Sequence, residues 1–311
     1  MACAWMRSVP VVCLSLAACS PAAPATPDAV SDLAMLPDLA AVRIVDAAAP
    51  APDAAGDCAD SLGDKARGGV CVRSVKGQLV VETGMPLADA MVTACANACF
   101  FGTSNAQGQF TVAIDNYIRL DQFSLLTHVN PRRAAFYLAL PAPVDGVVTF
   151  PKPLVARPMP PGGPEIRMDM SAQTLHGDGV DLFIDAGTTI FLSFDDTAEM
   201  PLGAELRPLT LTRFDDVPFL GGVVPLVLYG FGPFEADFNK PVRLSFANAT
   251  GLAAGTAVDV LAQHGLLHGG PPAARFDVVA AAHVSQDGTR VDLDPGAGIS
   301  TLTWIALRKK E

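Results

Sequence analysis

The chain has 311 residues, of which 50% are hydrophobic and 17% are charged, and its formal net charge is −11 at pH 7. This length allows one large or two medium domains. An acidic chain without a basic stripe repels phosphate backbones, so we expect no nucleic acid among its partners. Apart from the N-terminal apolar run, which is itself too short, no run approaches the length that crosses a bilayer.

The N-terminus carries an apolar run over residues 9–18, which follows Arg7 and closes on Leu16-Ala17-Ala18-Cys19. This ending resembles the lipobox of bacterial lipoproteins. The resemblance implies cleavage before Cys19 and acylation of its sulfur and new amino group, and several acyl chains hold a protein stably on a membrane. Ser20 in place of an aspartate favours the outer membrane by analogy with sorting rules. An ordinary secretory signal shares these features and is the alternative.

Residues 1–18 are therefore predicted to form a signal peptide, with Met6 as an alternative start to Met1. Residues 19–57 are mainly Ala, Pro and Asp with hardly an aromatic residue. Such a composition buries too little apolar surface to offset chain entropy, so we expect a disordered tether behind the lipidated cysteine.

Four cysteines remain beyond the predicted lipid site: Cys58, Cys71, Cys95 and Cys99. An envelope compartment favours oxidation, so we expect two disulfides, and three pairings are open. A structural zinc site usually presents two close cysteine pairs, and here only Cys95 and Cys99 are close. We therefore expect neither a metal nor another cofactor.

Residues 58–155 are expected to form a first all-β domain. Phe110, Val112 and Ile114 alternate with period two, as in a half-buried strand. The expected strands are 75–82, 90–94, 109–114, 123–128, 135–140 and 147–150. Turns are expected at 83–86 and 103–108, where Gly and Pro or Gly and Asn cluster.

Three segments carry a family resemblance: Gly77, then Gly84-x-Pro86-Leu87-x-x-Ala90-x-Val92, then Thr103…Gly108-x-Phe110. Over residues 71–155 they resemble the carboxypeptidase-regulatory-like, transthyretin-related β-sandwich. The resemblance implies a module without chemistry of its own. The segment from Cys95 to Cys99 departs from the family pattern.

Prolines crowd residues 151–164 and predict a Pro-rich linker over 156–167, because proline donates no hydrogen bond to a central sheet. Residues 168–311 predict a second β-sandwich. Its clearest strands are 180–184, 189–194, 209–212, 226–229, 242–246, 257–261, 276–280 and 302–307. The segments 182–188 and 229–244 resemble the ZU5-type β-sandwich of surface and autoproteolytic proteins. The His-Phe-Ser step of the autoproteolytic relatives is missing, so we expect no self-cleavage.

Two short patterns suggest chemistry. Asp185 lies in a segment that resembles the aspartic-peptidase turn, but Ala186 replaces the hydroxyl residue and the chain has no second copy, whereas that chemistry needs two carboxylates. His264 and His268 have the spacing of metal ligands on a helix, but the glycines and prolines around them predict a loop. We expect no catalytic residue from either pattern.

Several acidic clusters match no calcium loop and are interpreted as solvated turns. They are Asp178 with Asp181 and Asp185, Asp195-Asp196, Asp215-Asp216, and Asp292 with Asp294. Sugar binding by a β-sandwich usually uses exposed aromatic side chains. The candidates are Trp304, Tyr117, Tyr137 and Tyr229, and Trp304 is expected in the core.

We predict a non-catalytic cell-envelope lipoprotein of all-β class, with two β-sandwich domains for binding, adhesion or scaffolding. Its partners are the membrane, through the lipid, and an unknown envelope protein or glycan. The alternative is a carbohydrate-binding or enzyme-accessory lipoprotein, which predicts an exposed aromatic cluster. A third hypothesis, an envelope aspartic-type peptidase, predicts Asp185 carboxylates meeting across a two-fold axis.

Overall fold

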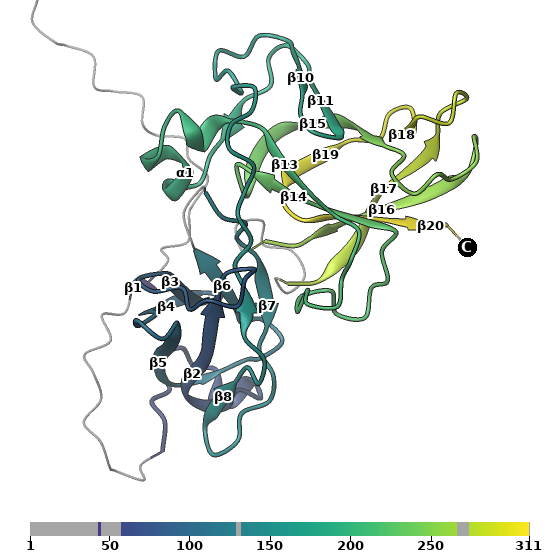
Figure 1. The fold of residues 1–311 in the computed structure, drawn as a ribbon. Coiled ribbons are helices and arrows are strands. Elements are labelled where there is room, and N and C mark those ends of the chain that lie inside the picture. Colours follow the sequence, from purple (N-terminus) through teal and green to yellow (C-terminus); the bar gives the residue numbers. More distant parts are fainter. Residues whose placement is uncertain (1–42, 45–56, 129–131, 266–273, 311) are drawn as a thin grey trace, which may run out of the picture. The chain divides into compact units, whose positions relative to one another are not determined.

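Strands β1 to β9 fall into two sheets, and strands β10 to β20 form a third (Figure 1). The computed structural model describes residues 43–44, 57–128, 132–265 and 274–310. Cys19, the signal peptide and nearly all of the predicted tether lie outside the described residues. Residues 42–311 belong to one compact unit. Almost all regular structure in the described part is β, so the predicted all-β class is confirmed.

Two sheets come from the first part of the chain. One has the order β5-β2-β8, with β9 also on β2, and the other the order β1-β4-β3-β6-β7. The strands are β1 (Arg43–Ile44), β2 (Val70–Val80), β3 (Met91–Cys95), β4 (Ala98–Thr103), β5 (Gln109–Ile118), β6 (Ser124–His128), β7 (Tyr137–Ala139), β8 (Val147–Thr149) and β9 (Leu154–Val155). A short 3-10 helix, Lys65–Arg67, precedes β2.

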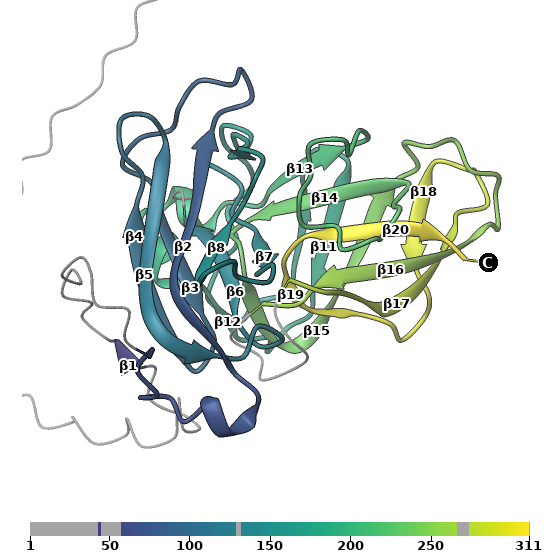
Figure 2. The ribbon, with the colours of Figure 1, turned by 90° about the horizontal axis from the view of Figure 1, so that it is seen from below.

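The longest pairing of this part joins β2 and β5, which run antiparallel side by side (Figure 2). On β5 every second residue is buried, so Phe110, Val112 and Ile114 point into the core as their alternation predicts. The predicted turn before β5 is confirmed too. Gly108 has φ 71°, and a Cβ atom there would lie 2.2 Å from the carbonyl oxygen of Leu79, so only glycine fits.

The second part of the chain forms one large sheet with the order β10-β11-β15-β18-β17-β16-β20-β14-β13, while β12 and β19 also pair with β15. The strands are β10 (Gln173–His176), β11 (Val180–Ile184), β12 (Ile190–Phe191), β13 (Arg207–Leu211), β14 (Val227–Gly232), β15 (Ala236–Ala247), β16 (Ala257–Gln263), β17 (Phe276–Val284), β18 (Arg290–Leu293), β19 (Ile299–Leu302) and β20 (Ile305–Lys309). Two short helices, α1 (Phe194–Ala198) and the 3-10 helix Leu202–Ala204, lie between β12 and β13.

The predicted strand over residues 302–307 is wrong, because it is two strands, β19 and β20. The chain breaks at Thr303 and Trp304, whose side chains turn into the interior. The Thr303 hydroxyl donates to the carbonyl of Gln263 at 2.8 Å, and the Trp304 indole donates to the carbonyl of Ala135 at 2.8 Å. Sequence analysis also does not predict β4, β10 or β18, of which β10 and β18 are only four residues long.

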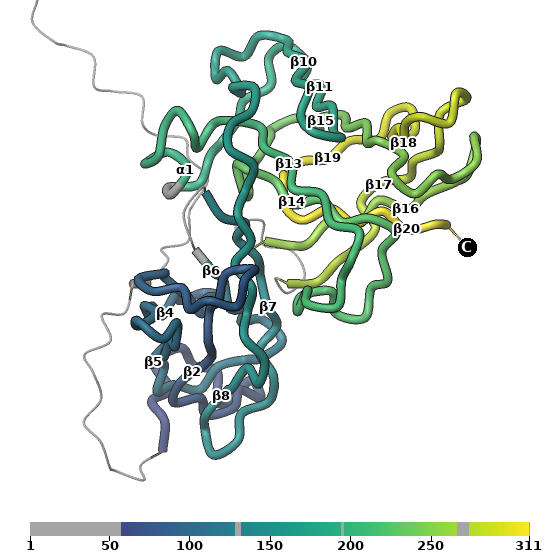
Figure 3. Tube along the Cα trace, viewed as in Figure 1, coloured from purple at the N-terminus to yellow at the C-terminus, as the bar shows by residue number. Residues whose placement is uncertain are grey.

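The Pro-rich segment over residues 156–167 is packed, and its path can be followed in Figure 3. Ala156, Met159 and Ile166 are buried. The amide of Ala156 donates to Val80 at 2.8 Å, and the amide of Ile166 donates to Ala204 at 2.9 Å. The segment is therefore fixed at both of its ends, whereas the domain limits at 58–155 and 168–311 stay a prediction.

A set of contacts, which we call the joint, connects the first β region to the second. Gln263 binds the main chain of Tyr137 in both directions: its Nε2 donates to the carbonyl at 3.0 Å, and its Oε1 accepts from the amide at 3.4 Å. The Tyr137 hydroxyl donates to Glu235 Oε2 at 2.6 Å. Beside them the Trp304 indole bonds to Ala135 and its ring lies 4.9 Å from that of Phe219.

Replacement of Trp304 by alanine should lower the free energy of unfolding by about 3 to 5 kcal/mol, because the side chain is only 1% exposed and its removal deletes a large buried apolar surface. Trp304→Phe should cost less, since it removes the indole hydrogen bond and keeps most of the apolar contact. Denaturant unfolding followed by circular dichroism measures both. A loss under 1 kcal/mol for Trp304→Ala would contradict the claim that the Trp304 contacts of the joint stabilise the fold.

Candidate functional site

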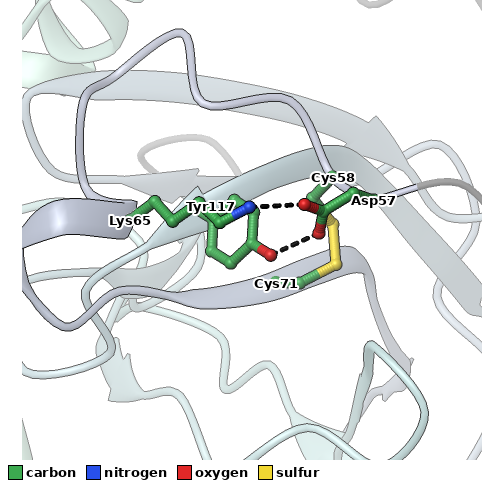
Figure 4. The surroundings of a disulfide bond; sticks show 5 residues. All are labelled: Asp57, Cys58, Lys65, Cys71 and Tyr117. Atoms are coloured by element: carbon green, nitrogen blue, oxygen red, sulfur yellow. Dashed lines mark hydrogen bonds and ion pairs between the residues drawn. A yellow bond between two sulfur atoms is a disulfide. The ribbon is translucent and has the colours of Figure 1, made fainter.

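The first site lies around Asp57 and the disulfide that follows it, shown in Figure 4. Upstream of it, Arg43–Ile44 forms β1 and pairs with β4, so these two residues of the predicted tether are not disordered as expected. Cys58 and Cys71 form a disulfide with a Cα–Cα distance of 5.5 Å, and Cys71 belongs to β2. The main chain beside it is paired as well, since the amide of Tyr117 donates to the carbonyl of Ala59 at 2.8 Å. The segment that enters from the predicted tether is therefore bonded to both β2 and β5.

Asp57 adds a polar contact at the same point. Its carboxylate accepts hydrogen bonds from Lys65 Nζ and from the Tyr117 hydroxyl, and the Lys65 ammonium lies 4.6 Å from the centre of the Tyr117 ring (Figure 4). The hydrogen bond from Lys65, and next the one from Tyr117, hold the pKa of Asp57 below its ordinary value of 3.8. The same pairing raises the pKa of Lys65. We call the disulfide and these three side chains the entry clamp.

The second disulfide closes a hairpin. Cys95 of β3 and Cys99 of β4 lie opposite each other in register, with a Cα–Cα distance of 4.2 Å. The prediction of two disulfides is confirmed, and the structure selects one of the three pairings.

The acidic residues of the second region lie partly in strands, which corrects their interpretation as turns. The pairing register aligns His176, Asp181, Ser245, Asp292 and His283 on five consecutive strands. Arg290 donates to Asp181 at 2.6 Å and to the Ser245 hydroxyl at 2.9 Å, and that hydroxyl donates to Asp292 at 2.6 Å. Hydrogen bonds thus connect Asp181, Arg290, Ser245 and Asp292 across the sheet.

The remaining residues singled out in the sequence are not brought together. Asp185 is an exposed residue after β11, and its carbonyl accepts from the Thr188 hydroxyl as in a turn. His264 Nε2 lies 2.8 Å from Asp277 Oδ2, in a contact that is not aligned as a hydrogen bond. His268 lies outside the described residues. Among the residues that the structure describes, no group of three His, Cys, Asp or Glu side chains is placed to hold a metal ion.

The aromatic candidates for sugar stacking are mostly interior. Trp304, Tyr137 and Tyr229 are fully buried, and burial raises the pKa of Tyr229 to about 12. Tyr117 is half-buried against Lys65. Of the described aromatic side chains, Phe101 and Phe191 are exposed, and they belong to β4 and β12 in different sheets. The described residues thus do not form the exposed aromatic cluster that the carbohydrate alternative predicts.

A cavity of about 370 Å³ lies in the second region. It is lined by Ala262, Gln263, His264, Gly265, Val279, Gly298, Ile299, Ser300, Thr301 and Thr303. Of these residues, the sequence analysis names only His264, and it does so because His264 and His268 have the spacing of metal ligands. The signal that could have pointed to the cavity is the presence of three hydroxyl residues, Ser300, Thr301 and Thr303, in a stretch of otherwise apolar sequence.

Comparison with known proteins shows no family. No family model matches the chain, and no curated protein matches it. One solved structure, a proposed carbohydrate-binding protein from Bacteroides uniformis, is similar at 9% sequence identity and a TM-score of 0.20. The alignment covers 76% of this chain and 98% of that chain. A similarity at this TM-score carries no argument about function. Within the described ranges, no helix is long and apolar enough to span a membrane.

The two disulfides should differ in their contribution to stability. Cys58 and Cys71 are 13 residues apart, and Cys95 and Cys99 are four apart. Because closing a longer loop removes more entropy from the unfolded chain, the double variant Cys58→Ser/Cys71→Ser should lose about 3 kcal/mol, and Cys95→Ser/Cys99→Ser about 2 kcal/mol. Parallel urea titrations measure both, and the reverse order would contradict this account.

The entry clamp should respond to acid. Since the folded-state pKa of Asp57 lies below 3.8, its ion pair stabilises the clamp above that pH and is lost as the pH falls through the lowered pKa. Lys65→Met should move the Asp57 midpoint up toward 3.8. Tyr117→Phe should move it in the same direction by less. Carboxyl NMR titration measures the midpoint, and an unchanged value in Lys65→Met would refute the pairing.

Proposed function

We propose that this protein is a lipid-anchored display protein of the cell envelope. Acyl chains on Cys19 hold it on the outer membrane, and residues 19–57 tether a β-structured unit that binds a partner without catalysis. The observation that carries the proposal is the entry clamp. A segment that continues from a membrane tether needs a firm attachment to the folded unit, and Cys58 is bonded covalently to β2 within one residue of the predicted end of that tether.

The N-terminal sequence supports the anchor. The basic residue, the short apolar run and the small residues before Cys19 are the features that lipid-modified precursors share with secretory signals. The Ala, Pro and Asp composition of residues 19–57 suits a flexible spacer, which allows the unit to reach some tens of ångströms from the membrane.

The joint supports a role in which the unit acts as a whole. The Gln263–Tyr137 and Trp304–Ala135 hydrogen bonds, both buried, connect the two β regions. We extend the proposal to the two β regions as modules related to the carboxypeptidase-regulatory-like and ZU5-type sandwiches, on the sequence resemblances alone. The partner class is an envelope protein or a glycan.

Cys19→Ser should release the protein from the membrane, because the serine cannot form the thioether that carries the lipid. Membrane and soluble fractions of cells that express the full chain, compared by immunoblot, measure the shift. Cys13→Ser is the matched control, since it changes a cysteine of the signal peptide and should leave the protein on the membrane. Membrane retention of Cys19→Ser would contradict the anchor.

A further inference from the structure

The cavity lies where two strand ladders separate. β19 pairs with β15, whereas β17 pairs with β16 and β18, and residues of both β19 and β17 line the cavity. A bulge in the β16–β17 ladder leaves Val279 without a partner residue, and the Val279 side chain borders the opening at 40% exposure. Bulges of this kind redirect a side chain at the edge of a sheet.

The polar groups of the cavity are held in place by bonds to their neighbours. Gln263 is fixed by two hydrogen bonds to Tyr137, and the Thr303 hydroxyl donates to the carbonyl of Gln263. The Thr301 hydroxyl donates to Asp237 at 3.0 Å. Polar groups that are already oriented lose little conformational entropy when a ligand binds. Ala262, Val279 and Ile299 supply an apolar wall beside them.

The charge around the cavity disfavours an anionic ligand. None of the ten described lining residues is Lys or Arg. Carboxylates lie directly behind the lining: Asp237 bonds to Thr301, and Asp277 contacts His264. Glu235 is a third, because a Cβ atom on Gly265 would fall 1.7 Å from its Oε1. Each of these carboxylates already has a partner within the protein, in Thr301, His264 or Tyr137.

We propose that this cavity binds a single uncharged sugar residue. Its volume of about 370 Å³ falls in the range of small-ligand sites. A pyranose has hydroxyl groups at its rim and C–H bonds on its faces. The lining offers both kinds of partner: the hydroxyls of Ser300 and Thr301 with the imidazole of His264, and the apolar side chain of Val279. The site rests on the proposed binding function and is independent of the lipid anchor.

The test uses the full chain carrying Cys19→Ser, in soluble form. The probes are glucose, galactose, N-acetylglucosamine and their β-linked disaccharides, with glucuronate and glucosamine as charged comparators. Protein-observed NMR titration should show saturable binding of a neutral sugar with a Kd of roughly 1 mM, as expected for a ligand with about a dozen heavy atoms. The shifts should involve His264, Ser300 and Thr301 and spare His283.

Two variants separate a cavity effect from a general one. Val279→Trp should fill the opening and weaken binding at least tenfold. Val278→Trp is the matched control: Val278 is the adjacent residue, 53% exposed and outside the lining, so binding should stay within twofold. Melting curves verify that both variants fold. If Val279→Trp does not fold, the location of binding is decided by which residues shift in the NMR titration of the protein without a valine substitution.

Three results would overturn the inference: no saturable binding of any neutral sugar, tighter binding of a charged comparator, or equal loss in the two valine variants. Binding of an extended peptide at the same residues, with no sugar binding, would also overturn it and assign the cavity to strand addition on β17 or β19. Because the test protein lacks the anchor, each of these results leaves the proposed membrane attachment intact.

Discussion

The structure depends on the hydrogen bonds of one buried side-chain amide, that of Gln263. Gln263 is 1% exposed, and an unpaired amide at such a position would cost about 1 to 3 kcal/mol. It is paired with the main chain of Tyr137, which lies 126 residues away in the other β region. Trp304 makes a parallel contact to Ala135. Buried hydrogen bonds and buried apolar side chains thus occur together at the joint. One hydrophobic cluster there contains residues of both β regions.

The joint and the cavity share a residue, Gln263. Gln263 lines the cavity and binds Tyr137. At the break between β19 and β20, Thr303 also lines the cavity, and Trp304 makes the indole contact. The entry clamp stabilises a different place, where the chain enters from the predicted tether. The joint thus connects strands of the two β regions, and the entry clamp attaches the segment that precedes β2.

Much of the strand pattern could be predicted, because alternation is a local property. Phe110, Val112 and Ile114 identify β5 directly, and the apolar strand around Trp304 indicates a core residue. The break between β19 and β20 could not be predicted, because it is set by Ala135 and Gln263, which are far away in the sequence. The disulfide pairing and the cavity depend likewise on which strands become neighbours, and spacing alone leaves that open.

The central claim is that a lipid on Cys19 anchors this β-structured unit. Mass spectrometry of the N-terminal peptide from the membrane-bound protein tests it most directly. The account predicts a peptide that begins at Cys19, lacks residues 1–18 and carries the added mass of acyl chains on that cysteine. A peptide that begins at any other residue, or an unmodified Cys19, would contradict it.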